Sequence, residues 1–205
     1  MSATFWDKQA ETYDVNIQNH DGQYAQTITE TAVLLNKSDI VLDLGCASGE
    51  MSMDLAPHAQ HILGIDSSAK MIELAQQKAA ARQLANIEFA QIDLFDTKLE
   101  PTSFHAIIAF NIFHLLPNPQ KAMSRIALLL TKDGLLISQT PCLGGRARLF
   151  RAAIALAQKG GMAPNIHSFT FQSLDQYIVS ESFDILQSKL WNKDDSVQWI
   201  VARKK

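Results

Sequence analysis

One short stretch, residues 41–50, constrains this chain more than any other. Its sequence, VLDLGCASGE, begins with apolar residues around Asp43, continues through Gly45 and small residues to Gly49, and leads into an amphipathic run. This pattern predicts a β-strand, a tight turn and the start of a helix. Glycine lets the backbone approach a ligand closely, and a helix N-terminus offers unpaired N–H groups and a positive dipole end. We therefore expect the turn to bind a ligand that carries a carboxylate, a phosphate or a ribose.

Two classes of ligand use a loop of this kind, dinucleotides and S-adenosyl-methionine. A dinucleotide site requires the pattern G-x-G-x-x-G. Counted from Gly45, the second and third glycines are replaced by Ala47 and Glu50. The third glycine normally lets the helix pack closely on the strand, and a glutamate in its place suits a pyrophosphate site poorly. A glycine-rich turn alone is equally compatible with an ordinary tight connection, so other parts of the chain have to decide.

Composition indicates a single domain and restricts the class of partner. The 205 residues are 47% hydrophobic and 19% charged, which is typical of one globular domain with a core. No run approaches the roughly 18 apolar residues of a membrane span, and the first residues lack the apolar segment of a signal peptide. Two cysteines give no disulfide framework and no zinc pattern. With a net charge of −3, we expect a cytoplasmic protein without a metal site or a nucleic-acid partner.

Strand and helix patterns alternate along the chain. Helical spacing predicts two helices between Phe5 and about Leu35, and further helices at Glu50–His58, Ser68 to about Leu84, Leu116–Leu130, Leu143–Gly161 and Thr170–Ser180. After the first strand, apolar runs predict strands at His61–Ile65, Asn86–Ile92, Phe104–Phe110, Leu135–Thr140, Phe183–Leu190 and Val197–Ala202. We expect Asp133 and Gly134 to form a turn, and Val197–Ala202 to be a half-buried edge strand. This alternation predicts a doubly wound sheet with right-handed crossovers.

The glycine loop and several later segments together resemble the class I S-adenosyl-methionine-dependent methyltransferases. Motif I of that family is D-x-G-x-G-x-G or D-x-G-C-G-T-G, and Ala47 and Ser48 depart from it whereas four positions agree, namely Asp43, Gly45, Cys46 and Gly49. The opening FWDKQAETYD is similar to the family's W-D-x-x-A-x-x-Y-D segment, and DSSAKMIELA to D-x-S-x-x-M-x-x-x-A. FAQIDL resembles motif II, and FHAIIAFNIFHLL resembles motif IV. The resemblance covers most of residues 5–140 and the final hairpin.

The resemblance implies both a fold and a function. The fold is a Rossmann-like α/β sheet of seven strands in the order 3-2-1-4-5-7-6, with the last strand antiparallel and helices on both faces. One domain would span residues 1–205, with residues 1–36 as a helical cap and residues 143–172 as a variable acceptor-site insertion. The implied enzyme transfers a methyl group in line from S-adenosyl-methionine to a small molecule and releases S-adenosyl-homocysteine. A non-catalytic binder of these molecules and a nicotinamide-dependent dehydrogenase are the alternatives.

Asp66 is the clearest candidate for contact with the cofactor. It lies 21 residues after Gly45, at the predicted end of the second strand, where a carboxylate can accept hydrogen bonds from both ribose hydroxyls. Both cofactor classes predict this contact, and capping of the next helix is the other interpretation. By resemblance, Met71 packs against adenine and Asp93 accepts a hydrogen bond from its amino group. The full set implied for the cofactor is Trp6, Tyr13, Asp43, Gly45, Cys46, Ala47, Gly49, Asp66, Ser67, Met71, Asp93, Leu94 and Phe110; core packing is the alternative for Trp6, Tyr13 and Met71.

The sequence does not identify the acceptor or the oligomeric state. Ligands of open α/β sheets lie beyond the carboxyl ends of the strands, where His114 follows the fourth strand. A sulfonium is already reactive, so a base is needed only for a hydroxyl or an acidic carbon. His114 is the candidate base because its ordinary pKa is near neutral, and His167 is a weaker one; a structural histidine bonded to a turn is the alternative. The basic helix Leu143–Gly161 is either a packed lid or a surface that admits a lipid-like quinone.

Overall fold

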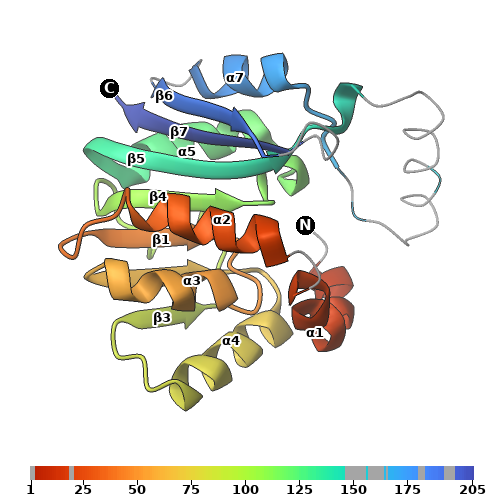
Figure 1. Cartoon of the computed structure of the whole chain (residues 1–205), viewed down its shortest axis with the longest axis vertical. Helices are drawn as coiled ribbons and strands as arrows, with labels where there is room; N and C mark the ends of the chain where they lie inside the picture. The colour runs from red at the N-terminus through yellow and green to blue at the C-terminus, as the bar shows by residue number, and fades with distance from the viewer. Residues whose placement is uncertain are drawn as a thin grey trace.

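Seven strands form one sheet in the part of the chain that the computed structural model describes, residues 3–18, 21–145, 156, 164, 166–179, 183–191 and 197–205. The strands are β1 Ile40–Leu44, β2 His61–Ile65, β3 Ile87–Ala90, β4 Phe104–Phe110, β5 Leu130–Pro141, β6 Phe183–Leu190 and β7 Val197–Lys204. The α-helices are α1 Ala3–Gln18, α2 Asp21–Ala32, α3 Glu50–Leu55, α4 Ala69–Ala81, α5 Pro119–Leu129 and α7 Phe171–Val179. Three 3-10 turns are η1 Ala56–His58, η2 Phe113–Leu115 and η3 Leu143–Gly145. The predicted order, β3-β2-β1-β4-β5-β7-β6, is confirmed (Figure 1).

The central strand β1 explains why the glycine loop lies in the middle of one sheet edge. β1 pairs in parallel with β2, where Asp43 faces Gly64, and with β4, where Asp43 faces Ile108. Val41 to Leu44 are buried, as expected for a strand that is covered on both faces. The carboxyl ends of β1, β2 and β4 therefore meet at one edge. Figure 1 shows α1 beyond this edge, past the end toward which the arrow of β4 points.

Two apolar layers cover the two faces of the sheet, and alternate residues of each strand enter different layers. Ile107 of β4 and Leu136 of β5 pack with Ile126 of α5 on one face. The next residue along β4, Ile108, packs on the other face with Trp199 of β7. This continuous burial anchors the strands, so the polar residues at their carboxyl ends are held by a rigid scaffold.

The prediction of a half-buried edge at Val197–Ala202 is wrong. β7 lies between β5 and β6, pairs antiparallel with both, and is buried through Ala202. The polar Gln198 is buried because its amide donates hydrogen bonds to Asp175 at 2.8 Å and to Ser188 at 2.9 Å. The exposed edge strand is β6 instead, since most of its residues after Phe183 face solvent.

Other element boundaries differ in ways that the backbone explains. The turn predicted at Asp133 and Gly134 lies within β5, as a bulge between the pairs Phe104–Leu130 and Ala106–Leu135, with a φ of +61° at Asp133. The helix predicted at Leu143–Gly161 begins as η3, and nearly all of its remainder lies outside the described residues. Within those residues, no helix combines the length and the apolar character needed to cross a membrane.

Candidate functional site

The loop after β1 turns sharply because three of its residues have a left-handed backbone. Gly45 has a φ of +76°, Ala47 of +48° and Gly49 of +79°. The amide nitrogens of Gly45 and Cys46 both donate to the carbonyl oxygen of Ile65, at 2.8 and 3.0 Å. The amide of Ala47 donates to Oδ2 of Asp66 at 3.2 Å. The end of β2 therefore holds the loop in place.

The two loop glycines allow close packing at different points. A Cβ atom on Gly45 would lie 2.7 Å from Cδ1 of Ile112, so glycine lets this side chain lie directly against the loop. A Cβ atom on Gly49 would lie 2.5 Å from Cζ of Phe89 in β3. Gly49 therefore serves the packing of the start of α3, and it is not among the residues that line the cavities described next.

Three adjoining cavities lie around the glycine loop. The first, about 190 Å³ in volume, has mostly apolar walls and the polar residues Asp66, Ser67 and Asp93. The second lies under α1, and its walls include Trp6, Tyr13, Met71 and Phe110. The third follows the loop itself, and its walls include Asp43, Cys46, Ser48 and Glu50. Gly45 lines all three cavities, so together they form one continuous candidate site.

The structure brings nearly all of the predicted cofactor residues to the walls of these cavities. Gly49 is the exception, while Leu94 lies in the first cavity and Ala47 in the second and third. Met71 is almost fully buried, so it packs as a core residue and also forms part of the second cavity. The roles of these residues in binding stay predictions.

Two cavity residues that the motifs do not single out follow β4 directly. Asn111 has a φ of +55°, an exposed side chain, and a position in the walls of the second and third cavities. The backbone amide of Asn111 donates a hydrogen bond to the carbonyl oxygen of Gln139 at 2.7 Å. An asparagine that ends an apolar strand is a recognisable signal, because asparagine tolerates the left-handed region. Ile112 carries no such signal, since only the fold places it against Gly45.

The site contains two carboxyl groups, the buried Asp43 and the half-buried Asp66. Burial raises the pKa of Asp43 to about 7, although the Ser52 hydroxyl donates a hydrogen bond to it; the charge of Asp66 adds to the rise. Burial also raises the pKa of Asp66, against the effect of hydrogen bonds from the amides of Ser68 at 2.8 Å and Ala47. Burial and these nearby charges raise the pKa of Tyr13 to about 12. Such surroundings favour a cationic ligand and oppose a pyrophosphate.

Ser67 and Asp66 together provide polar atoms that suit a ribose. The Ser67 hydroxyl oxygen is buried at the wall of the first cavity and has no hydrogen-bond partner among the described residues. Leaving such a group unpaired costs roughly 1–3 kcal/mol, which a polar ligand could recover. Each carboxylate oxygen of Asp66 accepts one backbone hydrogen bond and retains a further lone pair. A vicinal diol fits this pair of residues chemically.

His114 lies in η2, immediately beyond β4, and does not line the three cavities. Burial lowers its pKa to about 4, so the imidazole is neutral at pH 7. Its Nδ1 atom is buried and has no partner within the described part of the chain. The amide of His167, whose side chain is exposed, donates to the backbone oxygen of His114 at 2.6 Å. Catalysis by either histidine stays a prediction.

No group of three or more His, Cys, Asp and Glu side chains within the described ranges is arranged to hold a metal ion. The polar atoms of the site, namely carboxylates, a hydroxyl and loop amides, instead match an organic ligand with hydroxyl and cationic groups.

Comparison with known proteins gives a family match over most of this site. A family model described as a methyltransferase domain matches residues 35–163. A malonyl-[acyl-carrier protein] O-methyltransferase from Paenibacillus sp. is 28% identical over 142 residues, which cover 67% of this chain and 51% of that protein. A ubiquinone biosynthesis O-methyltransferase from Coxiella burnetii is 31% identical over 104 residues, 51% of this chain and 44% of the relative. This chain thus spans about half the length of these two relatives.

One relative is described as acting on RNA, and one solved structure extends the similarity to the fold. A 23S rRNA (uracil(1939)-C(5))-methyltransferase from Legionella pneumophila is 29% identical over 110 residues, 47% of this chain and 25% of that protein. The crystal structure of a protein described as a SAM-dependent methyltransferase from Methanosarcina mazei has a TM-score of 0.69, at 21% identity, and the match covers 83% of this chain and 94% of the other. At that identity, the structural match shows the shared fold.

Proposed function

This chain belongs to the class I S-adenosyl-methionine-dependent methyltransferases, and from that membership we propose that it transfers a methyl group from S-adenosyl-methionine to a small-molecule acceptor. The observation that carries the proposal is the pair of carboxylates, the buried Asp43 and the half-buried Asp66, beside a glycine loop that lines three adjoining cavities. S-adenosyl-methionine is a cation at its sulfonium and amino groups and carries a ribose. Its charge and hydroxyls complement this site, whereas the pyrophosphate of a nicotinamide dinucleotide would be repelled.

The cavities suggest a division of the site among the parts of the cofactor. We assign the ribose to Asp66 and Ser67, because one retains acceptor capacity and the other is an unpaired hydroxyl. The first cavity, with Asp93 and the buried Leu94, would take the adenine. The third cavity, with Asp43 and the loop amides, would take the amino-acid end.

Catalysis is proposed to depend mainly on positioning. When bound, S-adenosyl-methionine supplies an electrophilic methyl group on a sulfonium. The second cavity adjoins the other two, so we place the approach of the acceptor beside Phe110 and Asn111, with Trp6 and Tyr13 of α1 excluding water. Holding two reactants at near-attack distance can account for a large part of a rate enhancement. His114 is the proposed base for acceptors that must lose a proton; it lies in η2 just beyond β4, outside the walls of the three cavities, and its imidazole is neutral at pH 7.

A small acceptor is favoured over RNA by charge. The chain has a net charge of −3, and Asp43, Glu50 and Asp66 surround the glycine loop. A phosphate backbone would meet these carboxylates, and no lysine or arginine is among the described residues that line the three cavities. Two relatives are named for malonyl-[acyl-carrier protein] and for ubiquinone biosynthesis, and these names are compatible with an apolar or acidic small acceptor. We further propose that residues 1–36 form a lid and that residues 143–172 shape the acceptor pocket.

The test is a calorimetric titration of the protein with S-adenosyl-homocysteine, with NADH as the comparison ligand. Binding of S-adenosyl-homocysteine at one site, without binding of NADH, would support the cofactor assignment. Binding of NADH alone would overturn it. Release of S-adenosyl-homocysteine in the presence of quinols, phenols or small carboxylic acids would then rule out a non-catalytic binder, and methyl transfer only to RNA would contradict the proposed acceptor class.

A further inference from the structure

Two aspartates of the first helix, α1, attach it to the rest of the domain. Asp7 accepts hydrogen bonds from the hydroxyl of Ser68 at 2.6 Å and from the amide of Lys70 at 3.3 Å. Asp14 accepts a hydrogen bond from the hydroxyl of Ser48 and forms an ion pair with Lys78 at 2.8 Å. These contacts fix the helix across α4 and the glycine loop.

Trp6 and Tyr13 lie next to these two aspartates in the sequence, and both line the second cavity. Their rings contact each other edge to face, with centroids 6.3 Å apart. Aromatic pairs of this geometry are modestly stabilising. The position of α1 therefore decides whether the second cavity has a wall on this side, and the two aspartates help to fix that position together with the buried Ala10.

Lys78 of α4 forms ion pairs with both α1 and the start of α3, directly after the glycine loop. Its Nζ atom lies 2.8 Å from Asp14 of α1 and 2.8 Å from Glu50, the first residue of α3. The three side chains are each only about one-fifth to one-third exposed, so water screens these pairs less than it screens a surface pair. Without the cation, Asp14 and Glu50 would be two neighbouring carboxylates, which repel each other.

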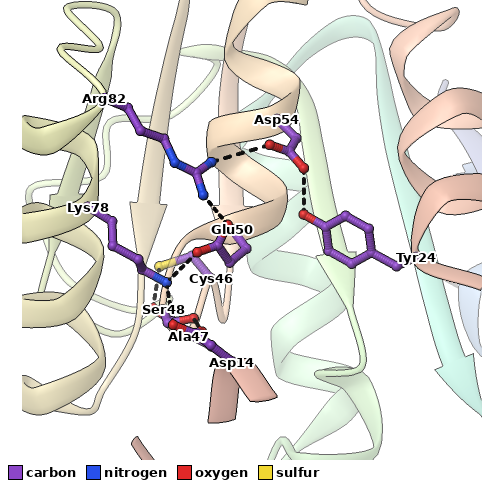
Figure 2. A network of polar contacts seen from close by, with 9 residues as sticks. All are labelled: Asp14, Tyr24, Cys46, Ala47, Ser48, Glu50, Asp54, Lys78 and Arg82. Carbon is purple, nitrogen blue, oxygen red and sulfur yellow. Dashed lines mark hydrogen bonds and ion pairs between the residues drawn. The ribbon is translucent and has the colours of Figure 1, made fainter. Parts of the chain in front are cut away.

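The ion pairs continue beyond Lys78, and together with a hydrogen bond from Tyr24 they connect four helices. Figure 2 shows the chain of contacts that passes from Asp14 through Lys78 to Glu50, then through Arg82 to Asp54 and Tyr24. Glu50 also lines the third cavity, so the network reaches the wall of the candidate cofactor site. A change at Lys78 would therefore affect both the lid and the loop.

We propose that Lys78 and Asp14 are positioning residues for the cofactor, whose ion pair holds α1, and with it Trp6 and Tyr13, over the glycine loop. The inference rests on the proposed cofactor site and deepens it. Tyr13 of α1 also lines the third cavity, which is assigned to the amino-acid end of the cofactor, and a protein that is closed for a smaller fraction of time binds with a proportionally weaker apparent affinity. Lys78 and Asp14 thus set how tightly and how long the cofactor is held.

The experiment compares Lys78→Met, which removes the charge and retains an apolar stem, with Lys78→Arg, which retains the charge. Glu30→Gln is the matched control, because it breaks another 2.8 Å ion pair, that of Glu30 with Lys189. Glu30 belongs to α2, the part of residues 1–36 that contributes no residue to the walls of the three cavities. We expect Lys78→Met, which removes the ion pairs with both Asp14 and Glu50, to weaken binding of S-adenosyl-homocysteine by roughly three- to tenfold. Lys78→Arg and Glu30→Gln should bind within about twofold of the wild type.

Amide hydrogen exchange of the ligand-free proteins provides a second measurement. In Lys78→Met, exchange should accelerate in α1 and stay unchanged in β1 and β4. Asp14→Asn should weaken binding in the wild type but add little in the Lys78→Met background, because both changes remove the same pair.

Three results would overturn the inference. One is unchanged affinity together with unchanged exchange in α1 of Lys78→Met, and another is faster exchange in β1 and β4 as well, which would indicate a general structural role. The third is equal weakening by Glu30→Gln. If the wild type fails to bind S-adenosyl-homocysteine, the proposed cofactor is wrong, whereas the exchange of α1 still shows separately whether Lys78 holds the helix.

Discussion

The backbone amide of Ala47 donates a hydrogen bond to the carboxylate of Asp66, with 3.2 Å between the nitrogen and Oδ2. This bond joins the loop after β1 to the residue that follows β2. Ala47 occupies the position of a glycine in the related motif, and its φ of +48° shows that the loop retains the left-handed turn with a methyl group present. The departure from the motif is therefore accommodated within the loop conformation.

Replacing Ala47 with glycine should stabilise the protein. An alanine in the left-handed region costs roughly 1–2 kcal/mol, partly offset by the greater freedom of glycine in the unfolded chain, so we expect Ala47→Gly to raise the free energy of unfolding by about 0.5–1 kcal/mol. Urea denaturation measures the change. Gly49→Ala should do the opposite and cost more than about 2 kcal/mol, because its Cβ atom would lie 2.5 Å from the ring of Phe89. A less stable Ala47→Gly would contradict this interpretation of the loop.

Removing the carboxylate of Asp66 should weaken cofactor binding. Hydrogen bonds to a charged group are worth about 1–3 kcal/mol, and we expect Asp66→Ala to reduce the affinity for S-adenosyl-homocysteine by that amount. Calorimetric titration checks the value, and Asp184→Ala, at an exposed residue of β6, is the control. An unchanged affinity in a folded Asp66→Ala variant would refute the ribose assignment.

Asp43 should make both stability and binding depend on pH. Its pKa is about 7 in the folded protein and lower in the unfolded chain, so the folded state binds more protons between about pH 4 and 7. Stability from this group is therefore lost as the pH rises through that window.

A bound ammonium favours the ionised carboxylate of Asp43, so S-adenosyl-homocysteine should bind more tightly, with release of protons, as the pH rises through 7. Calorimetric titrations in buffers of different ionisation enthalpy measure the number of protons released on binding, and Asp43→Asn should abolish this release.

His114 should produce a pH dependence of the opposite sign. Because burial lowers its pKa from 6.5 to about 4, the unfolded chain binds more protons between these values, and stability is lost as the pH falls through this window. Thermal unfolding of wild type and His114→Gln from pH 4 to 8 should differ in slope there. If His114 is also the base, His114→Gln should lower kcat on the order of 100-fold above pH 5, with no step near pH 6.5 in the wild-type rate profile.

The strands that carry the site could be predicted because their apolar runs are continuous and end at turn residues. His61–Ile65 and Phe104–Phe110 have the predicted bounds. The prediction failed at β7 because the burial of Gln198 depends on Asp175 of α7 and Ser188 of β6, which are distant in sequence.

The ion pairs of α1 could not be predicted for the same reason. Asp14 lies 34 residues from Ser48 and 64 from Lys78. Asp14 and Ser48 lie in segments that match family patterns, but those patterns do not indicate which side chains contact each other. The contact of Ile112 with Gly45 could not be predicted either, because it follows from the pairing of β1 with β4. Local patterns thus predict the elements, whereas contacts between polar side chains of separate elements require the tertiary structure.

The attachment of α1 also bears on the order in which the chain folds. The helix contributes no strand to the sheet, and Ala10 is the one side chain of α1 in the fully buried core among its described residues. Its partners Ser48, Ser68 and Lys78 become neighbours only after β1, β2 and α4 have assembled. The first helix of the sequence is therefore expected to dock late in folding, so that the sheet can be complete before the protein is able to retain its cofactor.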